Sequence, residues 1–476
     1  MLLQSHRGGR AAAAPRCAAR KTASTPRRVR PIAVLVAAIA AALGAASAAR
    51  AENLQELYDA ARGYDATYLS ARATLDASQY RLEQTYALRR PSVGLELTGG
   101  RQAGTTPGAQ TESARSTAYS ATVSGTQPLF NRANDKTIAQ AEKSLDIART
   151  DFDSAEQDLI LRVSQAYFDV LAAQDTLTTA RSSKAAISET VASAKRNFEV
   201  GTATITDTRE AQARFDLARA TEILAENDLT TKRIALDQLV GRVNVAPKQL
   251  AVPVALPPVD PPNVDDWVGR ADAEHPLVRK ARLALEVARL ETEKAKAGHL
   301  PTVAVGASIE RGHSSTQGDV YINSRLPYSV ITPATSAGVS VTLNMPLFAG
   351  YAIQNRVKET LVLEDKSQDD LAAARRAVAQ ATRTIFYGVR SGVAQVEALE
   401  AAESSSQLAL QATQLGYKVG VRVNIDVLNA QAQLYTTQAQ LAKARYDVVM
   451  AGLRLRQASG QLSASDVAAV NRLLQP

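Results

Sequence analysis

Side chains that commonly carry chemistry are few in this chain and lie far apart. Its four histidines are His6, His275, His299 and His313, and no two of them have the spacing of a metal-binding pair. The single cysteine, Cys17, has no second thiol with which to form a disulfide. No glycine-rich loop ends in Gly-Lys-Ser or Gly-Lys-Thr, so the sequence has no recognisable phosphate-binding loop for a nucleotide. This distribution predicts that the chain is not an enzyme and uses no metal or cofactor.

Two groups of neighbouring acids come closest to a catalytic pair, Asp151 with Asp153 and Asp369 with Asp370. Both groups fall inside long stretches that we expect to be helical, where charged side chains normally face solvent. We therefore interpret them as exposed helix charges.

The elements that would position any site are arranged as a duplication. Pro128–Phe130 recurs as Pro346–Phe348, and Val200-Gly201 recurs as Val419-Gly420 at almost the same offset. A regular internal repeat indicates one structural unit used twice. We expect a first repeat over residues 52–241, a proline-rich linker over 242–266 and a second repeat over 267–476.

Residues 1–51 differ from the rest of the chain in charge. They hold nine lysines and arginines and no acid, which leaves 46 basic residues against 47 acidic ones in the remainder. The apolar run 32–46 follows this basic stretch and is itself followed by small residues, the pattern of a secretory signal peptide. We expect the segment to be removed, so its basicity does not indicate a nucleic-acid partner.

Long helices with a seven-residue apolar repeat dominate both halves. Residues 131–200 contain no proline or glycine, and every seventh residue from Ile138 to Ala194 is apolar. Seventy helical residues would be roughly 105 Å long, which suits a strut or the wall of a tube. Further helices are expected over 54–90, 204–240, 276–298 and 351–415, and a last one follows Gly420.

Four segments alternate apolar and small polar residues over about ten positions, the length of a tilted membrane strand. They centre on residues 93–98, 119–124, 303–309 and 337–343, and we expect polar loops over 99–116 and 311–335. Past the signal, no apolar run is long enough for a transmembrane helix. Four strands cannot close a barrel, and an open edge cannot lie in lipid, so several chains would have to pool their strands.

This order of elements resembles the outer-membrane efflux proteins of the TolC family over nearly all of residues 52–474. The most specific motifs are Val200–Asp207 with 210–213, and Tyr417–Arg422 with Asp426–Gln431. The resemblance implies a mainly α-helical fold with a membrane β-barrel. Three chains would form a homotrimer, with four strands each in a twelve-stranded barrel and duplicated coiled-coil helices in an α-helical tunnel.

The resemblance also implies roles for residues at the two helical turns. Thr206 and Asp207 match the first-hairpin gate positions, and Tyr417 and Arg422 match the partners that reach toward them. Asp426 matches a first acidic ring lining the pore. Asn429 stands where the best-known member of the family carries a second acid. We therefore expect one ring of three charges rather than two such rings. Gly201 and Gly420 mark the turns expected to dock an adaptor.

The expected function is a passive exit duct in the outer membrane that extends into the periplasm. Its partners would be a periplasmic adaptor, an inner-membrane pump and outer-membrane lipid. The sequence leaves the cargo open between secreted protein and small toxic molecules. Two alternatives remain at this point: a periplasmic coiled-coil scaffold or adaptor that never enters lipid, and a secreted pore-forming toxin.

Overall fold

The computed structural model describes residues 52–105, 111–251, 258–321 and 324–475. The expected signal peptide, residues 1–51, lies outside these ranges and stays a prediction. Among the described residues, no helix is both long and apolar enough to cross a bilayer.

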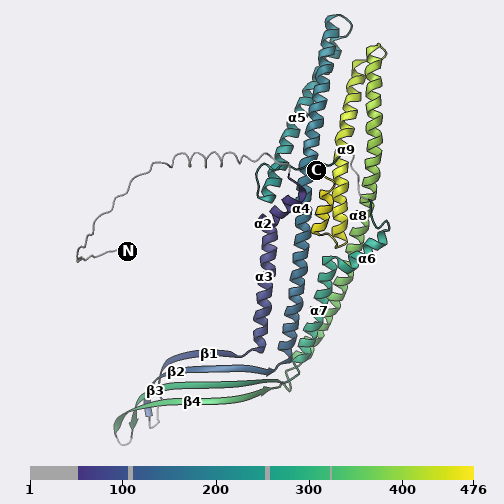
Figure 1. Ribbon diagram of the computed structural model, residues 1–476. Helices are drawn as coiled ribbons and strands as arrows, with labels where there is room; N and C mark the ends of the chain where they lie inside the picture. The colour runs from purple at the N-terminus through teal and green to yellow at the C-terminus, as the bar shows by residue number, and fades with distance from the viewer. Residues whose placement is uncertain (1–51, 106–110, 252–257, 322–323, 476) are drawn as a thin grey trace, which may run out of the picture. The chain divides into compact units, whose positions relative to one another are not determined.

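The first half begins with three helical pieces and a hairpin of strands (Figure 1). Helix α2 spans Leu54–Tyr64, α3 spans Ala66–Tyr86, and a 3-10 turn follows at Ala87–Arg89. Strands β1 (Ser92–Thr105) and β2 (Thr111–Phe130) lead into the long helix α4 (Arg132–Glu199) and the returning helix α5 (Ile205–Val240). The prediction of a single helix over 54–90 is wrong, because the chain is divided at Asp65 into α2 and α3. Asp65 adopts an extended conformation and caps α3 by accepting a hydrogen bond from the Tyr68 amide at 2.7 Å.

The second half has the same order of long elements. It comprises α6 (Val264–Glu274), α7 (Pro276–Ala297), β3 (Thr302–Tyr321), β4 (Arg325–Asn344), α8 (Ala352–Lys418), α9 (Asn424–Ala458) and α10 (Ala464–Asn471). The short helices α6 and α10 were not predicted. The imidazole of His275 caps α7, since its Nδ1 accepts the Leu277 amide at 3.1 Å. Burial lowers the pKa of His275 and so favours the neutral acceptor form.

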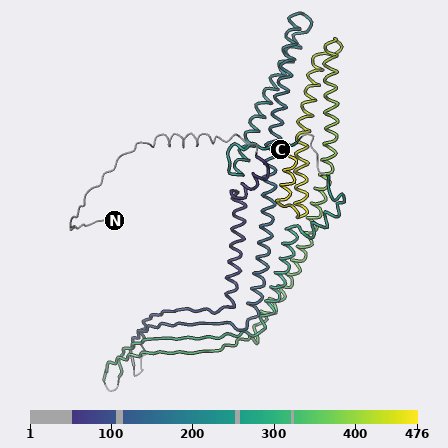
Figure 2. Tube along the Cα trace, viewed as in Figure 1, coloured from purple at the N-terminus to yellow at the C-terminus, as the bar shows by residue number. Residues whose placement is uncertain are grey.

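The long helices pack as the seven-residue repeat predicts. Helix α4 lies beside α5, and α8 lies beside α9, each pair running to a turn (Figure 2). On α4 the repeat positions Ile138, Leu145, Leu159 and Ile187 are buried. Small residues continue the repeat: Ala194 is fully buried. The apolar row thus forms a seam along the whole helix.

Polar contacts join the two halves along α4 and α7. Lys143 pairs with Glu286 at 2.7 Å, and Lys136 pairs with Glu293. The acids considered above as a possible pair take part here: Asp151 binds Lys280 at 2.8 Å and Asp153 binds Arg279 at 3.1 Å. Each pair is at least partly exposed and contributes about 1 kcal/mol or less, so the row aligns the helices more than it stabilises them.

One ion pair is more enclosed. Asp65, only 9% exposed, accepts two hydrogen bonds from the Arg162 guanidinium, at 2.8 and 2.9 Å. These hydrogen bonds outweigh the cost of burial and lower the pKa of the Asp65 carboxyl. The break between α2 and α3 is thereby fixed against α4.

The four strands form one antiparallel sheet in the order β1-β2-β3-β4. They are longer than predicted: β2, β3 and β4 have 20 residues each. The predicted polar loops are wrong over 99–105, 111–116, 311–321 and 325–335, because the glycines and small polar residues there continue the paired register. Pro128 does not end β2. The strand continues to Phe130 through a register shift between Pro128 and Phe130.

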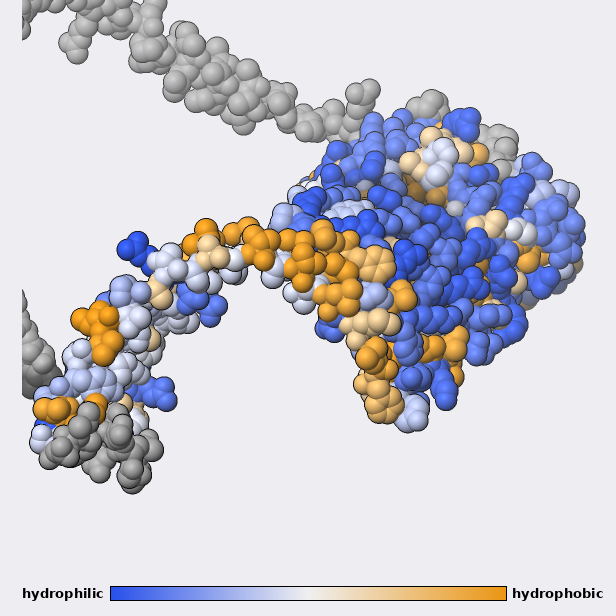
Figure 3. Space-filling view, turned by 90° about the horizontal axis from the view of Figure 1, so that it is seen from below, coloured by the Kyte–Doolittle hydropathy of each residue, from blue (hydrophilic) through white to orange (hydrophobic). Residues whose placement is uncertain are grey.

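The two faces of the sheet differ in chemistry. On the part of the sheet next to the helices, cross-strand pairing places the large apolar residues on one face, which we call the apolar face: Val93, Leu95, Leu97, Val123, Val305, Ile309, Val339, Val341 and Leu343. Arg311, which pairs with Ala121, lies on the same face. The opposite face carries mainly glycine, serine and threonine, with Glu96 and Glu310. Apolar surface is continuous on the part of the sheet next to the helices and becomes mixed farther out (Figure 3).

Candidate functional site

The two helical turns predicted as functional have matching geometry. Gly201 has φ +80° and Gly420 has φ +79°, a left-handed conformation that glycine adopts without strain. The Thr202 amide donates to the Asn197 carbonyl, and the Val421 amide donates to the Gly416 carbonyl, each at 2.8 Å. Both long helices therefore end in the same glycine-terminated motif, as expected of a duplicated unit.

The helices that leave these turns begin differently. At the first turn Thr204 and Asp207 form a capping box: the Thr204 amide donates to the Asp207 carboxylate at 3.0 Å, and the Asp207 amide donates to the Thr204 hydroxyl at 3.2 Å. At the second turn Val423 stands where the first has Thr204, and it offers no capping oxygen.

This difference decides what the two equivalent acids contact. Asp426 is the counterpart of Asp207 in the second repeat, but it has no capping hydroxyl to bind. Its carboxylate instead lies 3.6 Å from the Arg422 guanidinium, one helical turn earlier. Asp426 is partly exposed.

Polar side chains connect the first helical hairpin to the second. Asn197 donates to the Tyr417 hydroxyl at 3.2 Å, and Asn424 donates to the Asp207 carbonyl at 3.4 Å. Arg214 donates to the Asn429 side-chain oxygen at 3.2 Å. Asn429 therefore contacts a cation, at the position where the best-known member of the family carries an acid.

An apolar contact lies beneath these polar links. Leu428 of α9 is 2% exposed and packs on Ile187, Val191 and Ala194 of α4 and on Ala211 of α5. Burying a leucine side chain contributes about 2 kcal/mol. Packing thus holds the two hairpins together more firmly than any single hydrogen bond at the tips does.

The predicted site residues therefore lie at the two neighbouring turns, with partners that the sequence did not indicate. Thr206 is exposed on the first turn of α5. Asp207 and Arg422 do not pair with each other within the described part of this chain, and their link stays a prediction. Asn197, Arg214 and Asn424 were missed, because their roles depend on which helices become neighbours.

Known proteins resemble this chain over most of its length. A family described as "Outer membrane efflux protein" matches residues 57–242 and 267–461. Outer membrane protein TolC of Vibrio cholerae is 32% identical over 440 residues, covering 91% of this chain and 96% of the relative. The alkaline protease secretion protein AprF of Pseudomonas aeruginosa is 32% identical over 355 residues, covering 73% of this chain and 71% of the relative.

A solved structure agrees in fold. The outer membrane protein VceC of Vibrio cholerae superposes with a TM-score of 0.70 and 16% identity, covering 86% of this chain and 96% of that one. These similarities to outer-membrane proteins do not favour the alternative of a periplasmic scaffold. The chain belongs to the outer membrane efflux protein family and is a channel protein of the outer membrane.

Proposed function

We propose that three copies of this chain assemble into one exit duct that crosses the outer membrane and continues through the periplasm. The observation that carries the proposal is the open four-stranded sheet with one apolar face. Its edge strands β1 and β4 present backbone groups that lipid cannot satisfy. Pairing β4 of one copy with β1 of the next would satisfy both edges, and three copies give twelve strands.

Exposed apolar side chains on the helices support the same assembly. Leu217, Leu224, Val362 and Leu408 are each largely exposed in the single chain. Large apolar side chains in such numbers indicate surfaces that other chains cover. Neighbouring copies would bury them as the helices close into a tunnel.

The proposed trimer can be tested by measuring the mass of the assembly. The mature protein extracted from outer membranes should have three times the mass of one chain by native mass spectrometry, and unheated samples should keep that mass during electrophoresis. A water-soluble monomer absent from the outer-membrane fraction would overturn the proposal.

The proposed gate is the cluster at the two turns. Thr206, Asp207, Tyr417 and Arg422 would hold the tunnel's inner end closed, and each link is worth about 1 kcal/mol. Weak links suit a gate that a partner opens. We propose that the turns at Gly201 and Gly420 dock a periplasmic adaptor that joins the duct to an inner-membrane pump. Secreted protein and small toxic molecules both suit such a duct, and the pump that co-purifies decides between them.

The proposed selectivity ring makes a separate prediction. Three Asp426 carboxylates around one passage would attract cations. Asp426→Ala should therefore lower the preference for cations over anions, measured as the reversal potential across a salt gradient in planar bilayers. Asp447→Ala is the matched control, because Asp447 is an exposed acid on the same helix, paired with Lys443 at 2.9 Å. Equal reversal potentials for both variants and the wild type would remove Asp426 from the passage.

A further inference from the structure

The apolar face of the sheet has aromatic residues at both ends of the stretch that carries its large apolar side chains, a stretch that also includes Arg311 opposite Ala121. Phe130 pairs with Val303 at the helix end of β2, and Tyr119 pairs with Gly99 farther along. Both aromatic side chains are exposed, at 45% and 61%. Membrane barrels commonly carry such residues where lipid meets water on either side.

The distance between them fits a bilayer. Phe130 and Tyr119 are eleven positions apart, which is about 36 Å along a strand and roughly 25 Å in height for a strand tilted by 45°. This height equals that of the apolar band of an outer-membrane barrel. The residues just beyond Tyr119 therefore lie at the level of lipid headgroups.

A hollow of about 490 Å³ lies at that level. Its lining includes Arg101, Arg115, Thr117, Ser315 and Gln317, from three adjacent strands. The register places all five on the apolar face, which is the face that meets lipid. Two guanidinium groups with neighbouring hydroxyl and amide groups form a donor set suited to phosphate.

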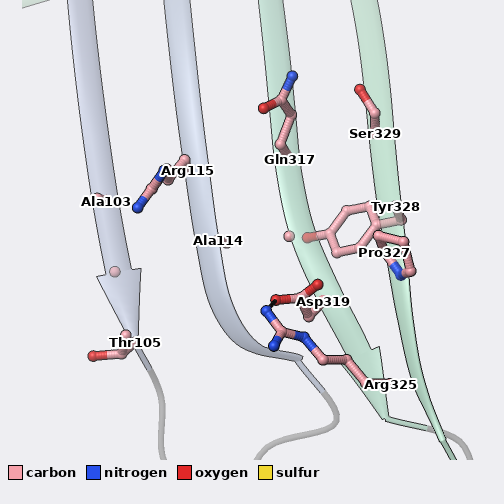
Figure 4. A pocket seen from close by; sticks show the side chains of 12 residues that line it. Ala103, Thr105, Ala114, Arg115, Gln317, Asp319, Arg325, Pro327, Tyr328 and Ser329 are labelled. Carbon is pink, nitrogen blue, oxygen red and sulfur yellow. Dashed lines mark hydrogen bonds and ion pairs between the residues drawn. The ribbon is translucent and has the colours of Figure 1, made fainter.

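Among the described side chains, the charge of this region is positive. Neither Arg101 nor Arg115 has an ion pair or side-chain hydrogen bond within the described ranges. The nearby acid on this face, Asp319, is bound by Arg325 at 2.5 Å in the adjoining hollow, which Arg115 and Gln317 also line (Figure 4). Glu96 and Glu310 lie on the opposite face.

We propose that this hollow binds a phosphate group on the headgroup of a lipid in the outer leaflet. The lipid's acyl chains would lie against the apolar stretch, and Arg101 and Arg115 would bind the phosphate oxygens. The site fixes the depth of the barrel and attaches lipid to its wall. This proposal rests on the proposed orientation of the sheet in the membrane and is independent of the proposed gate.

The test is binding of bisphosphorylated lipid A to the detergent-solubilised assembly, followed by native mass spectrometry. Arg101→Gln with Arg115→Gln should weaken binding by roughly tenfold or more, because two charge-assisted contacts are lost. Arg376→Gln with Arg390→Gln, two exposed arginines on α8, is the matched control and should bind as the wild type does. Arg101→Lys with Arg115→Lys keeps the charge, and its affinity for lipid A should lie between those of the wild type and the double glutamine variant.

Two further arms identify the source of the phosphate. Dephosphorylated lipid A should bind the wild type as weakly as intact lipid A binds the double glutamine variant. Inorganic phosphate at the same concentration should not displace the lipid. Equal binding of both lipids, displacement by inorganic phosphate, or an unchanged double variant would each overturn the proposal. The mass and conductance of the variants show independently whether the duct itself has assembled.

Discussion

Tyr417→Phe combined with Arg422→Glu should raise the single-channel conductance of the duct several-fold in planar bilayers. The first change removes the hydroxyl that accepts the Asn197 amide at 3.2 Å. The second replaces the cation 3.6 Å from Asp426 with an acid at the same one-turn spacing, so attraction becomes repulsion. Both changes act on the second turn. The first breaks a contact with the first hairpin, and the second removes the cation that we propose reaches Asp207 of that hairpin.

The matched control is Tyr387→Phe with Arg390→Glu on the same helix. Tyr387 is 55% exposed and lies two residues before a buried valine, far along α8 from the turn. The same two substitutions there change charge equally but break no contact between hairpins, so conductance should stay at the wild-type level. If both double variants raise conductance equally, the increase is a general effect of charge. The assignment of the gate residues would then be wrong, although the protein would still be a channel.

The long helices could be predicted from the sequence because their signal is strong and local. The seven-residue row from Ile138 to Ala194 predicts both the length of α4 and its buried side. The Val-Gly turns were equally clear, since a left-handed helix terminus almost requires glycine. By contrast, the break at Asp65 was missed, although an aspartate that can cap the following helix is a usable signal.

Strands β1 and β2 were underestimated because their outer halves lose apolar alternation. Residues 99–105 and 111–118 contain no large apolar side chain, yet they continue the ladder of backbone hydrogen bonds. Backbone pairing depends on the neighbouring strand, which local sequence does not reveal. The contacts Asn197–Tyr417 and Arg214–Asn429 were unpredictable for a related reason: each joins residues from different halves of the chain.

The difference between the two turns, however, could have been predicted from the sequence. Aligning Gly201 with Gly420 makes Asp426 the equivalent of Asp207 and Val423 the equivalent of Thr204. A capping box needs the hydroxyl and the acid together, so only the first turn can form one. Duplication has thus left Asp207 bound in the cap of its own helix, whereas Asp426 has no capping hydroxyl to bind.

The orientation of the sheet predicts the largest effect of a single substitution. Val339→Arg places a cation on the apolar face near the middle of the stretch between the two aromatic levels, where Val339 is 78% exposed. An arginine facing lipid at such a depth costs about 2–4 kcal/mol, and the trimer would incur this cost three times. The amount of heat-stable trimer in the outer-membrane fraction should fall sharply.

Ser340→Arg is the control that makes this a test of orientation. It adds the same charge one residue away, at nearly the same depth, but on the face of small polar residues. That face would line the aqueous interior, where arginine keeps its hydration, so trimer should accumulate almost as in the wild type. If Ser340→Arg abolishes the trimer and Val339→Arg does not, the faces are reversed, and both the barrel and the lipid-phosphate site would have to be abandoned.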